Sequence, residues 1–177
     1  MSRVAKHHKD TAPRSMGLFI LTCSTSRFKQ QEAGKYAEDR SGDIIERLAT
    51  SAGHRIEGRR LVTDSKTMIT RAARRAFSSE KVDVLIVTGG TGISPRDVTI
   101  ESISPLITKE IPGFGELFRK VSFDKIGSAA ILSRAVAGLV TGKAVFCLPG
   151  SPDAVRTAMN ELILPELGHI ARIAREH

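Results

Sequence analysis

A glycine-rich turn is the strongest candidate for chemistry in this sequence. Gly89-Gly90-Thr91-Gly92 directly follows an apolar run, where glycines let backbone N–H groups approach an anion without a Cβ in the way. The Thr91 hydroxyl could add a donor. The turn is not a Walker loop, because no Gly-Lys-Ser/Thr follows, and Pro95 replaces the third glycine of a dinucleotide-binding fingerprint. A phosphate cradle and a plain tight turn both explain these residues.

Two aspartates raise the question of a metal ion. Asp64 follows the second expected strand, and Asp97 lies a few residues beyond the glycine turn. A carboxylate beside a bound phosphate would be repelled unless a divalent cation lay between them. With Arg96 nearby, the pair suggests an Mg²⁺–nucleotide site. An Asx turn or a helix cap would explain either aspartate taken alone.

Two further segments could bind anions. Pro149-Gly150-Ser151 precedes an expected helix, so it offers either an anion-binding N-terminus or an ordinary N-cap at Ser151. Ser133 and Arg134 lie in an alanine-rich stretch that we expect to be helical. A guanidinium there needs a phosphate or carboxylate partner, unless it is simply exposed on the surface.

No residues suggest a covalent nucleophile. The histidines form no triad with a serine or cysteine, and His7-His8 lacks a third metal ligand. Cys23 and Cys147 have neither Cys-x-x-Cys nor metal-ligand spacing, so we expect buried structural thiols.

Alternating strands and helices must position these residues. Apolar or mixed runs predict strands at 17–22, 55–62, 82–88 and 143–148, the second nearer a sheet edge. A polar loop is expected at 23–26. Helical spacing predicts helices at 44–52, 68–77, 100–107, 114–121, 128–137 and 155–163, and Pro165 should kink or end the last.

This order predicts an α/β fold of three layers, Rossmann-like, with a mostly parallel sheet and helices on both faces. Ligands of such sheets bind beyond the carboxyl ends of the strands. We therefore expect Ser24, Asp64, Gly89–Gly92 and Pro149–Ser151 along one rim. Residues 1–16 are expected to form a flexible basic tail, and residues 17–177 a single domain.

Composition limits the class of protein. Of the 177 residues, 41% are hydrophobic and 26% charged, which is enough for a core, and no apolar run approaches the ~20 residues of a membrane span. The start of the chain has no apolar segment typical of a signal peptide, so we expect a soluble cytoplasmic protein.

The net charge of +8 lies almost wholly in residues 1–16 and 55–75. That distribution favours an anionic ligand, or a solvated helix face at Arg71, Arg74 and Arg75, over a nucleic-acid surface. Aromatic residues make up only 5%, which also argues against nucleic-acid binding through base stacking.

Four ordered segments resemble the MoaB/Mog family of molybdenum-cofactor biosynthesis proteins. They are 88–99 (Thr-Gly-Gly-Thr-Gly-Ile-Ser-Pro-Arg-Asp-Val-Thr), 112–119, 126–138 and 148–152, and the resemblance spans about residues 17–170. It implies a molybdopterin-binding α/β domain that assembles as a trimer or hexamer. Active members transfer AMP from Mg·ATP to the phosphate of molybdopterin and release pyrophosphate. The product then receives molybdate or tungstate on a partner protein.

The resemblance also implies roles for residues. Asp64 and Asp97 match the family's functional acids, which are expected to be catalytic and to hold Mg²⁺. The implied substrate- and nucleotide-binding residues are Ser24, Thr88, Gly89, Gly90, Thr91, Gly92, Arg96, Thr99, Ser133, Arg134, Pro149, Gly150 and Ser151. Asp97-Val98-Thr99 is kept, which favours a catalytic member. Thr25 stands where many relatives carry an acid. A pterin-binding scaffold without activity is the alternative.

Overall fold

The computed structural model describes residues 15–175, which build a six-stranded sheet in the order β2-β1-β3-β6-β5-β4. The strands are β1 (Gly17–Cys23), β2 (Arg55–Val62), β3 (Val84–Thr88), β4 (Lys109–Glu110), β5 (Val136–Val140) and β6 (Lys143–Leu148). Strands β2, β1, β3 and β6 are mutually parallel. Strand β5 runs antiparallel to β6, and β4 runs antiparallel to β5. The mostly parallel sheet is as predicted.

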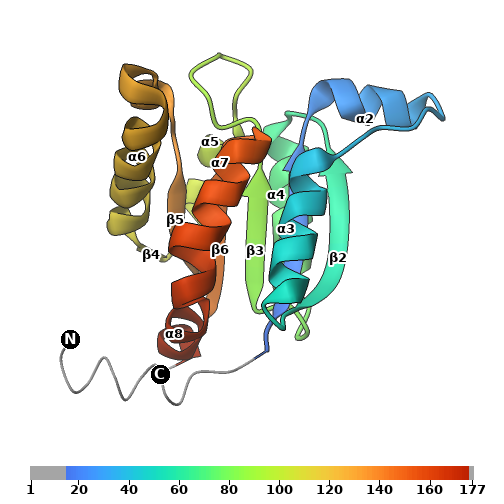
Figure 1. The fold of residues 1–177 in the computed structure, drawn as a ribbon. Helices are drawn as coiled ribbons and strands as arrows, with labels where there is room; N and C mark the ends of the chain where they lie inside the picture. The colour runs from blue at the N-terminus through green and yellow to red at the C-terminus, as the bar shows by residue number, and fades with distance from the viewer. Residues whose placement is uncertain (1–14, 176–177) are drawn as a thin grey trace, which may run out of the picture.

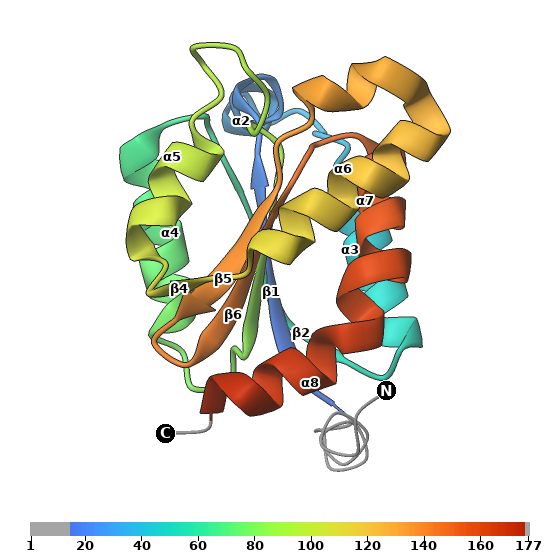
Figure 2. The ribbon, with the colours of Figure 1, turned by 90° about the vertical axis from the view of Figure 1, so that its left-hand side faces the viewer.

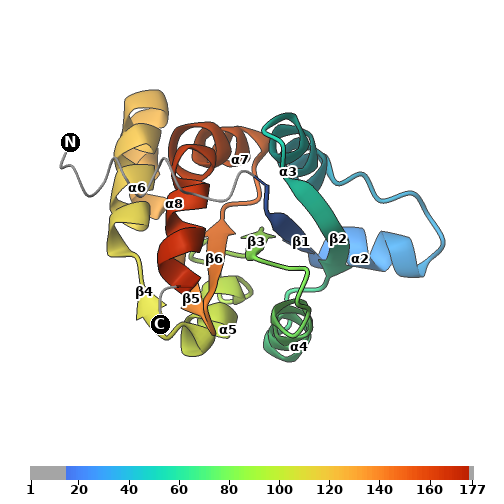
Figure 3. The same ribbon diagram turned by 90° about the horizontal axis from the view of Figure 1, so that it is seen from below.

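Helices cover both faces of this sheet (Figures 1 and 3). One face carries α3 (Arg40–Ser51), α6 (Pro112–Ile126) and α7 (Pro152–Thr157). The other carries α4 (Lys66–Phe77) and α5 (Thr99–Ile103), which the 3-10 helix η1 (Ser104–Leu106) extends. Each face buries its own apolar cluster against the strands. The predicted three layers are confirmed.

Burial explains which strands the sequence reveals. All five residues of the central strand β3 are buried, so it consists of an unbroken apolar run. The mixed strand β2 lies at the sheet edge, as predicted, and exposes Arg55, Arg59 and Arg60. Met16, at the end of the predicted tail, is fully buried, and its carbonyl accepts from the N–H of Arg55. Residues 1–14, with His7 and His8, lie outside the described residues.

The predicted helix over 128–137 is wrong. The 3-10 helix η2 (Gly127–Leu132) is followed by a short loop with Ser133 and Arg134 and then by β5. Pairing with β6 outweighs the helix propensity of the alanines. Gly138, directly after the predicted helix, lies inside β5, where a Cβ would be 2.8 Å from the carbonyl oxygen of Lys109.

Two other segments differ from their prediction. The expected loop at 23–26 contains the start of α2 (Thr25–Glu32), whose N-cap Ser24 accepts from the N–H of Arg27 at 3.5 Å. No residue of α2 is buried, so it has no apolar periodicity. The helix predicted at 114–121 is longer, because α6 spans Pro112–Ile126, and its apolar residues do not all face the core: Phe114 and Phe118 are buried, whereas Leu117 is 52% exposed.

The C-terminal helical segment changes direction near Pro165, as expected. After α7 a π-helical stretch, η3 (Ala158–Ile163), leads into α8 (Leu164–Arg175), and Figure 2 shows α8 crossing below the sheet at an angle to α7. Pro165 has no N–H to donate to the preceding turn, and that turn is the π-helical stretch from which α8 continues. Within residues 15–175, no helix is long and apolar enough to cross a membrane.

Candidate active site

A pocket of about 980 Å³ opens at the carboxyl ends of β1, β2, β3 and β6. The carboxyl ends of these strands lie at the upper end of the sheet in Figure 1. Twelve residues implied by the resemblance line it: Ser24, Asp64, Gly89, Gly90, Thr91, Gly92, Arg96, Asp97, Ser133, Arg134, Pro149 and Gly150. Segments that are far apart in the sequence therefore converge on one cavity, as the topology of a parallel sheet requires.

The glycine turn has the backbone shape of an anion cradle. Gly89 and Gly90 have φ angles of 91° and 60°, which L side chains rarely adopt. Thr99 holds both of their carbonyl groups by hydrogen bonds: its Oγ1 donates to the Gly89 oxygen at 2.7 Å, and its N–H donates to the Gly90 oxygen at 2.9 Å. Since each peptide is planar and trans, the N–H groups of Gly90 and Thr91 point away from Thr99. No described residue accepts from them.

Three of the implied binding residues do not line the pocket. Thr88 is fully buried and donates to the carbonyl oxygen of Pro149 at 3.1 Å, which links the glycine turn to the Pro-Gly turn. Thr99 is also buried and shapes the glycine turn. Ser151 is the N-cap of α7, where its Oγ accepts from the N–H of Ala154 at 3.3 Å. These residues position the walls and do not contact the cavity.

Thr25 fixes the Asp64 carboxylate. Its backbone N–H and its Oγ1 both donate to Asp64 Oδ2, at 2.9 and 2.7 Å, and the Asp64 N–H donates back to the same hydroxyl at 3.1 Å. The other carboxylate oxygen, Oδ1, lies beside Gly90, where an added Cβ would be 2.7 Å away. The position after Ser24 therefore supplies hydrogen-bond donors to Asp64 in place of a second acid.

Asp97 closes a turn in the loop beyond the glycines. Its Oδ2 accepts from the N–H of Ser94 at 3.0 Å, and its N–H donates to the Ser94 carbonyl at 2.8 Å. Its carboxylate also packs against Gly92, where a Cβ would lie 2.7 Å from Oδ2. This differs from an Asx turn, in which the carboxylate would accept from an N–H two residues later. Because the turn uses only Oδ2, Asp97 both stabilises this loop and lines the pocket.

The donor set fits an Mg²⁺ ion that arrives with a nucleotide. Asp64 and Asp97 each leave Oδ1 without a hydrogen bond from a described residue. Among residues 15–175, however, no three His, Cys, Asp or Glu side chains are grouped as a complete metal site. Mg²⁺ is commonly bound by one or two carboxylates, with water and substrate phosphates completing its shell.

Arg134 is anchored before any ligand binds. Its guanidinium forms two hydrogen bonds to the Glu101 carboxylate, at 2.7 and 3.3 Å, and its Nε donates to the Thr91 carbonyl at 2.9 Å. The carboxylate partner expected for this arginine is therefore Glu101. Because Arg134 also lines the pocket, it joins the glycine turn to the cavity wall.

The acid sensitivity of folding tests this ion pair. The hydrogen bond from Arg134 lowers the pKa of Glu101 below its ordinary value. A carboxyl of this kind adds stability above its unfolded pKa, about 4.3 for glutamate, and loses it as the pH falls through the folded value. We expect Glu101→Gln to lose less stability than the unmodified chain between about pH 7 and pH 3, in paired urea denaturations. Equal losses would contradict the prediction.

Cations outnumber acids around the pocket. Besides Arg96 and Arg134, the wall includes Arg27 and Lys29 from α2, against the carboxylates Asp64 and Asp97. Six lining residues were not predicted as binding residues from the sequence: Cys23, Thr25, Ser26, Arg27, Lys29 and Leu132. Two basic residues shortly after a strand's carboxyl end were the signal available for α2. The positive excess suits a ligand with several phosphate oxygens.

The pocket contains no activated thiol. Cys23 lines it from β1, yet burial raises its pKa to about 12, and burial also raises the pKa of Cys147. Since the thiolate is the reactive species, we expect both cysteines to resist alkylation in the folded chain at about pH 8 and to react rapidly in denaturant. Mass spectrometry after iodoacetamide treatment measures this. Rapid labelling of folded Cys23 would show that its environment is misassigned.

Comparison with known proteins identifies the family. Residues 19–169 match a family described as a probable molybdopterin binding domain. The chain belongs to the MoaB/Mog family. Molybdenum cofactor biosynthesis protein B of Bacillus cereus is 48% identical over 164 residues, covering 92% of this chain and 93% of that protein. The same-named protein of Bacillus subtilis is 43% identical over 172 residues, covering 97% of each.

Solved structures of MoaB/Mog proteins share the fold. The crystal structure of the tungsten cofactor synthesizing protein MoaB from Pyrococcus furiosus has a TM-score of 0.82 and 38% identity, and covers 93% of this chain and 100% of that one. This chain is therefore a member of the family of molybdenum and tungsten cofactor biosynthesis proteins.

Proposed function

We propose that this MoaB/Mog member is a molybdopterin adenylyltransferase, which transfers AMP from Mg·ATP to the phosphate of molybdopterin and releases pyrophosphate. One observation supports this most: the pocket joins a glycine turn with free N–H groups, four cations and two carboxylates. Such a site suits two phosphate-bearing ligands held together. ATP and molybdopterin are the substrates, and Mg²⁺ accompanies the nucleotide.

The reaction needs no strong base. A phosphate oxygen of molybdopterin, already ionised, attacks the α-phosphorus of ATP, and the bond from that phosphorus to the bridging oxygen of the β-phosphate breaks. Catalysis then consists of alignment and charge neutralisation. The N–H groups of Gly90 and Thr91 bind phosphate oxygens, and Arg96 and Arg134 neutralise charge. Asp64 and Asp97 would hold Mg²⁺, which supplies further positive charge when bound.

A direct assay tests the proposal. The purified chain is incubated with molybdopterin and Mg·ATP, and adenylylated pterin and pyrophosphate are measured against a reaction without pterin. We expect both products in equal amounts. Pterin binding without either product would contradict the enzymatic function and indicate a pterin-binding scaffold.

We also propose that the chain forms a homotrimer or hexamer in the cytoplasm through the apolar surface of α6 and η2. Five large apolar side chains there are 52–82% exposed: Leu117, Phe123, Ile126, Ile131 and Leu132. Several large apolar side chains exposed on two consecutive elements suit an interface between protein chains. The product would pass to a downstream protein that inserts molybdate.

Light scattering tests the assembly. We expect the mass of a trimer or hexamer for the unmodified chain and a shift toward monomer for the double variant Phe123→Ser, Ile131→Ser. Tyr36→Ser serves as a control, because Tyr36 is 87% exposed but lies outside α6 and η2. A monomeric unmodified chain would contradict the proposed assembly.

A further inference from the structure

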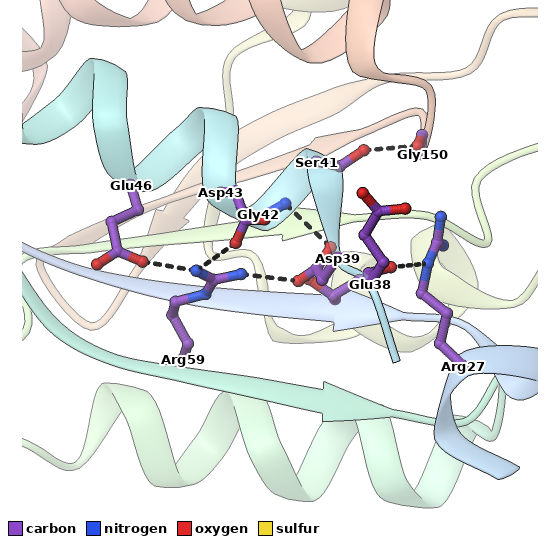
Figure 4. A network of polar contacts seen from close by, with 10 residues as sticks. Arg27, Glu38, Asp39, Ser41, Gly42, Asp43, Glu46, Arg59 and Gly150 are labelled. Carbon is purple, nitrogen blue, oxygen red and sulfur yellow. Dashed lines mark hydrogen bonds and ion pairs between the residues drawn. The ribbon is translucent and has the colours of Figure 1, made fainter. Parts of the chain in front are cut away.

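A polar network at the corner between α2 and α3 has its centre at Asp39, outside the pocket (Figure 4). The Asp39 side chain is only 15% exposed, and three donors satisfy it. Thr22 Oγ1 from the end of β1 donates at 2.7 Å, the Gly42 N–H at 3.0 Å, and Arg59 Nη2 from β2 at 3.2 Å. Asp39 therefore joins the start of α3 to the two neighbouring strands.

Arg59 binds further acids on α3. Its Nη1 contacts Asp43 at 2.8 Å and Glu46 at 2.6 Å, along the side of the helix that faces β2. The corner is tightly packed, because a Cβ on Gly42 would lie 2.2 Å from Asp39 Oδ2. The acids of this network therefore differ in their partners. Asp39 bonds to β1 as well as to Arg59, whereas the Asp43 and Glu46 side chains contact Arg59 alone among the residues of the network.

Two contacts lead from this corner to two segments that line the pocket, α2 and Pro149–Gly150. Ser41, which is 2% exposed, donates its hydroxyl to the Gly150 carbonyl at 2.8 Å, and Gly150 packs against Gly89 of the glycine turn. On the other side, Arg27 Nε in α2 donates to the Glu38 carbonyl at 2.8 Å. Figure 4 shows both contacts extending from the segment that Asp39 anchors.

We propose that Asp39 is a positioning residue that sets the separation of the α2 wall and the Pro149–Gly150 wall of the pocket, acting through Ser41 and Glu38. The inference rests on the proposed function for the identity of the ligand. Because Asp39 does not contact the cavity, its loss displaces groups that bind phosphates without removing any of them. We expect KM for Mg·ATP to rise while kcat changes little, the signature of lost uniform binding.

Matched variants separate positioning from general stability. Asp39→Ala removes the anchor, and Ser41→Ala removes only the link to Gly150, so it is informative even if the first variant folds poorly. Asp43→Asn and Glu46→Gln each remove an ion pair of Arg59 but leave both links to the pocket, and they are the controls. Asp39→Asn keeps an oxygen acceptor, so this variant should retain most of the Mg·ATP binding that Asp39→Ala loses.

The probe is Mg·ATP, titrated calorimetrically into the full chain, with amide hydrogen exchange measured on the same variants. We expect Asp39→Ala and Ser41→Ala to weaken Mg·ATP binding about 10- to 100-fold, as small misplacements of binding groups do. Exchange should become faster in both variants at the amides of Gly89 and Val155, which donate to the carbonyls of Leu148 and Ser151 on either side of the Pro149–Gly150 wall. The controls should behave like the unmodified chain.

The inference is overturned if exchange at the Gly89 and Val155 amides is unchanged in both variants, or if Asp43→Asn and Glu46→Gln weaken binding as much as Asp39→Ala does. Failure of the proposed function is a separate result, read from the unmodified chain as the absence of adenylylated pterin. The exchange measurement needs no ligand, so the positioning role is tested in either case.

Discussion

Asp97→Ala will leave the chain folded and able to bind molybdopterin, but will lower AMP transfer by about 100-fold or more. The variant loses the charge that would hold Mg²⁺ at the pocket wall, and it also loses the acceptor for the Ser94 N–H. Turnover measured with saturating molybdopterin and Mg·ATP, together with pterin binding, gives the two quantities needed.

Two further variants assign the effect to charge. Asp97→Asn keeps an oxygen acceptor for Ser94 while removing the charge, so it should lose nearly as much turnover as the alanine variant. Asp153→Ala is the matched control, because Asp153 is an exposed acid on α7 whose partner is Arg156. AMP transfer at the normal rate in Asp97→Ala would show that Asp97 has no part in catalysis.

Gly89→Ala will cost about 3 kcal/mol or more of the free energy of unfolding. Its φ of 91° is strained for alanine, and the new Cβ would lie 2.3 Å from the carbonyl oxygen of Cys23. The Cys23 carbonyl is backbone at the end of the buried strand β1, and Gly89 directly follows the neighbouring strand β3, so neither can move aside cheaply. Urea denaturation of the two chains measures the difference.

Gly113→Ala is the control for this prediction. Gly113 lies in the first turn of α6, has no positive φ, and an added Cβ would meet no atom within 4 Å. Its free energy of unfolding should stay within about 0.5 kcal/mol of the unmodified value. If Gly89→Ala unfolded at the same urea concentration as Gly113→Ala, the described shape of the glycine turn would be wrong.

The parts of the fold that follow from local pattern were predictable. Strands β1, β3 and β6 are buried runs, so their sequences are unbroken and apolar. Once these strands are parallel, the segments after their carboxyl ends must meet. That is why the convergence of Asp64, Gly89–Gly92 and Pro149 on one rim could be expected before any coordinates.

The parts that depend on distant partners were not predictable. Helix α2 buries no residue, so no periodicity marks it, and β5 is a strand only because β6 lies beside it. The same holds for roles. Nothing near Asp39 in the sequence shows that Thr22 and Arg59 donate to it. Likewise, nothing near Thr25 shows that it bonds to Asp64.

The outer strands of the sheet also govern how the chain avoids aggregation. At one end β4 is only two residues long, and at the other β2 displays Arg55, Arg59 and Arg60. Very short edges and charged edges both discourage another molecule from adding a strand by main-chain pairing. Copies of this protein are therefore steered away from continuous intermolecular sheets, and contacts between them fall to the helical surfaces instead.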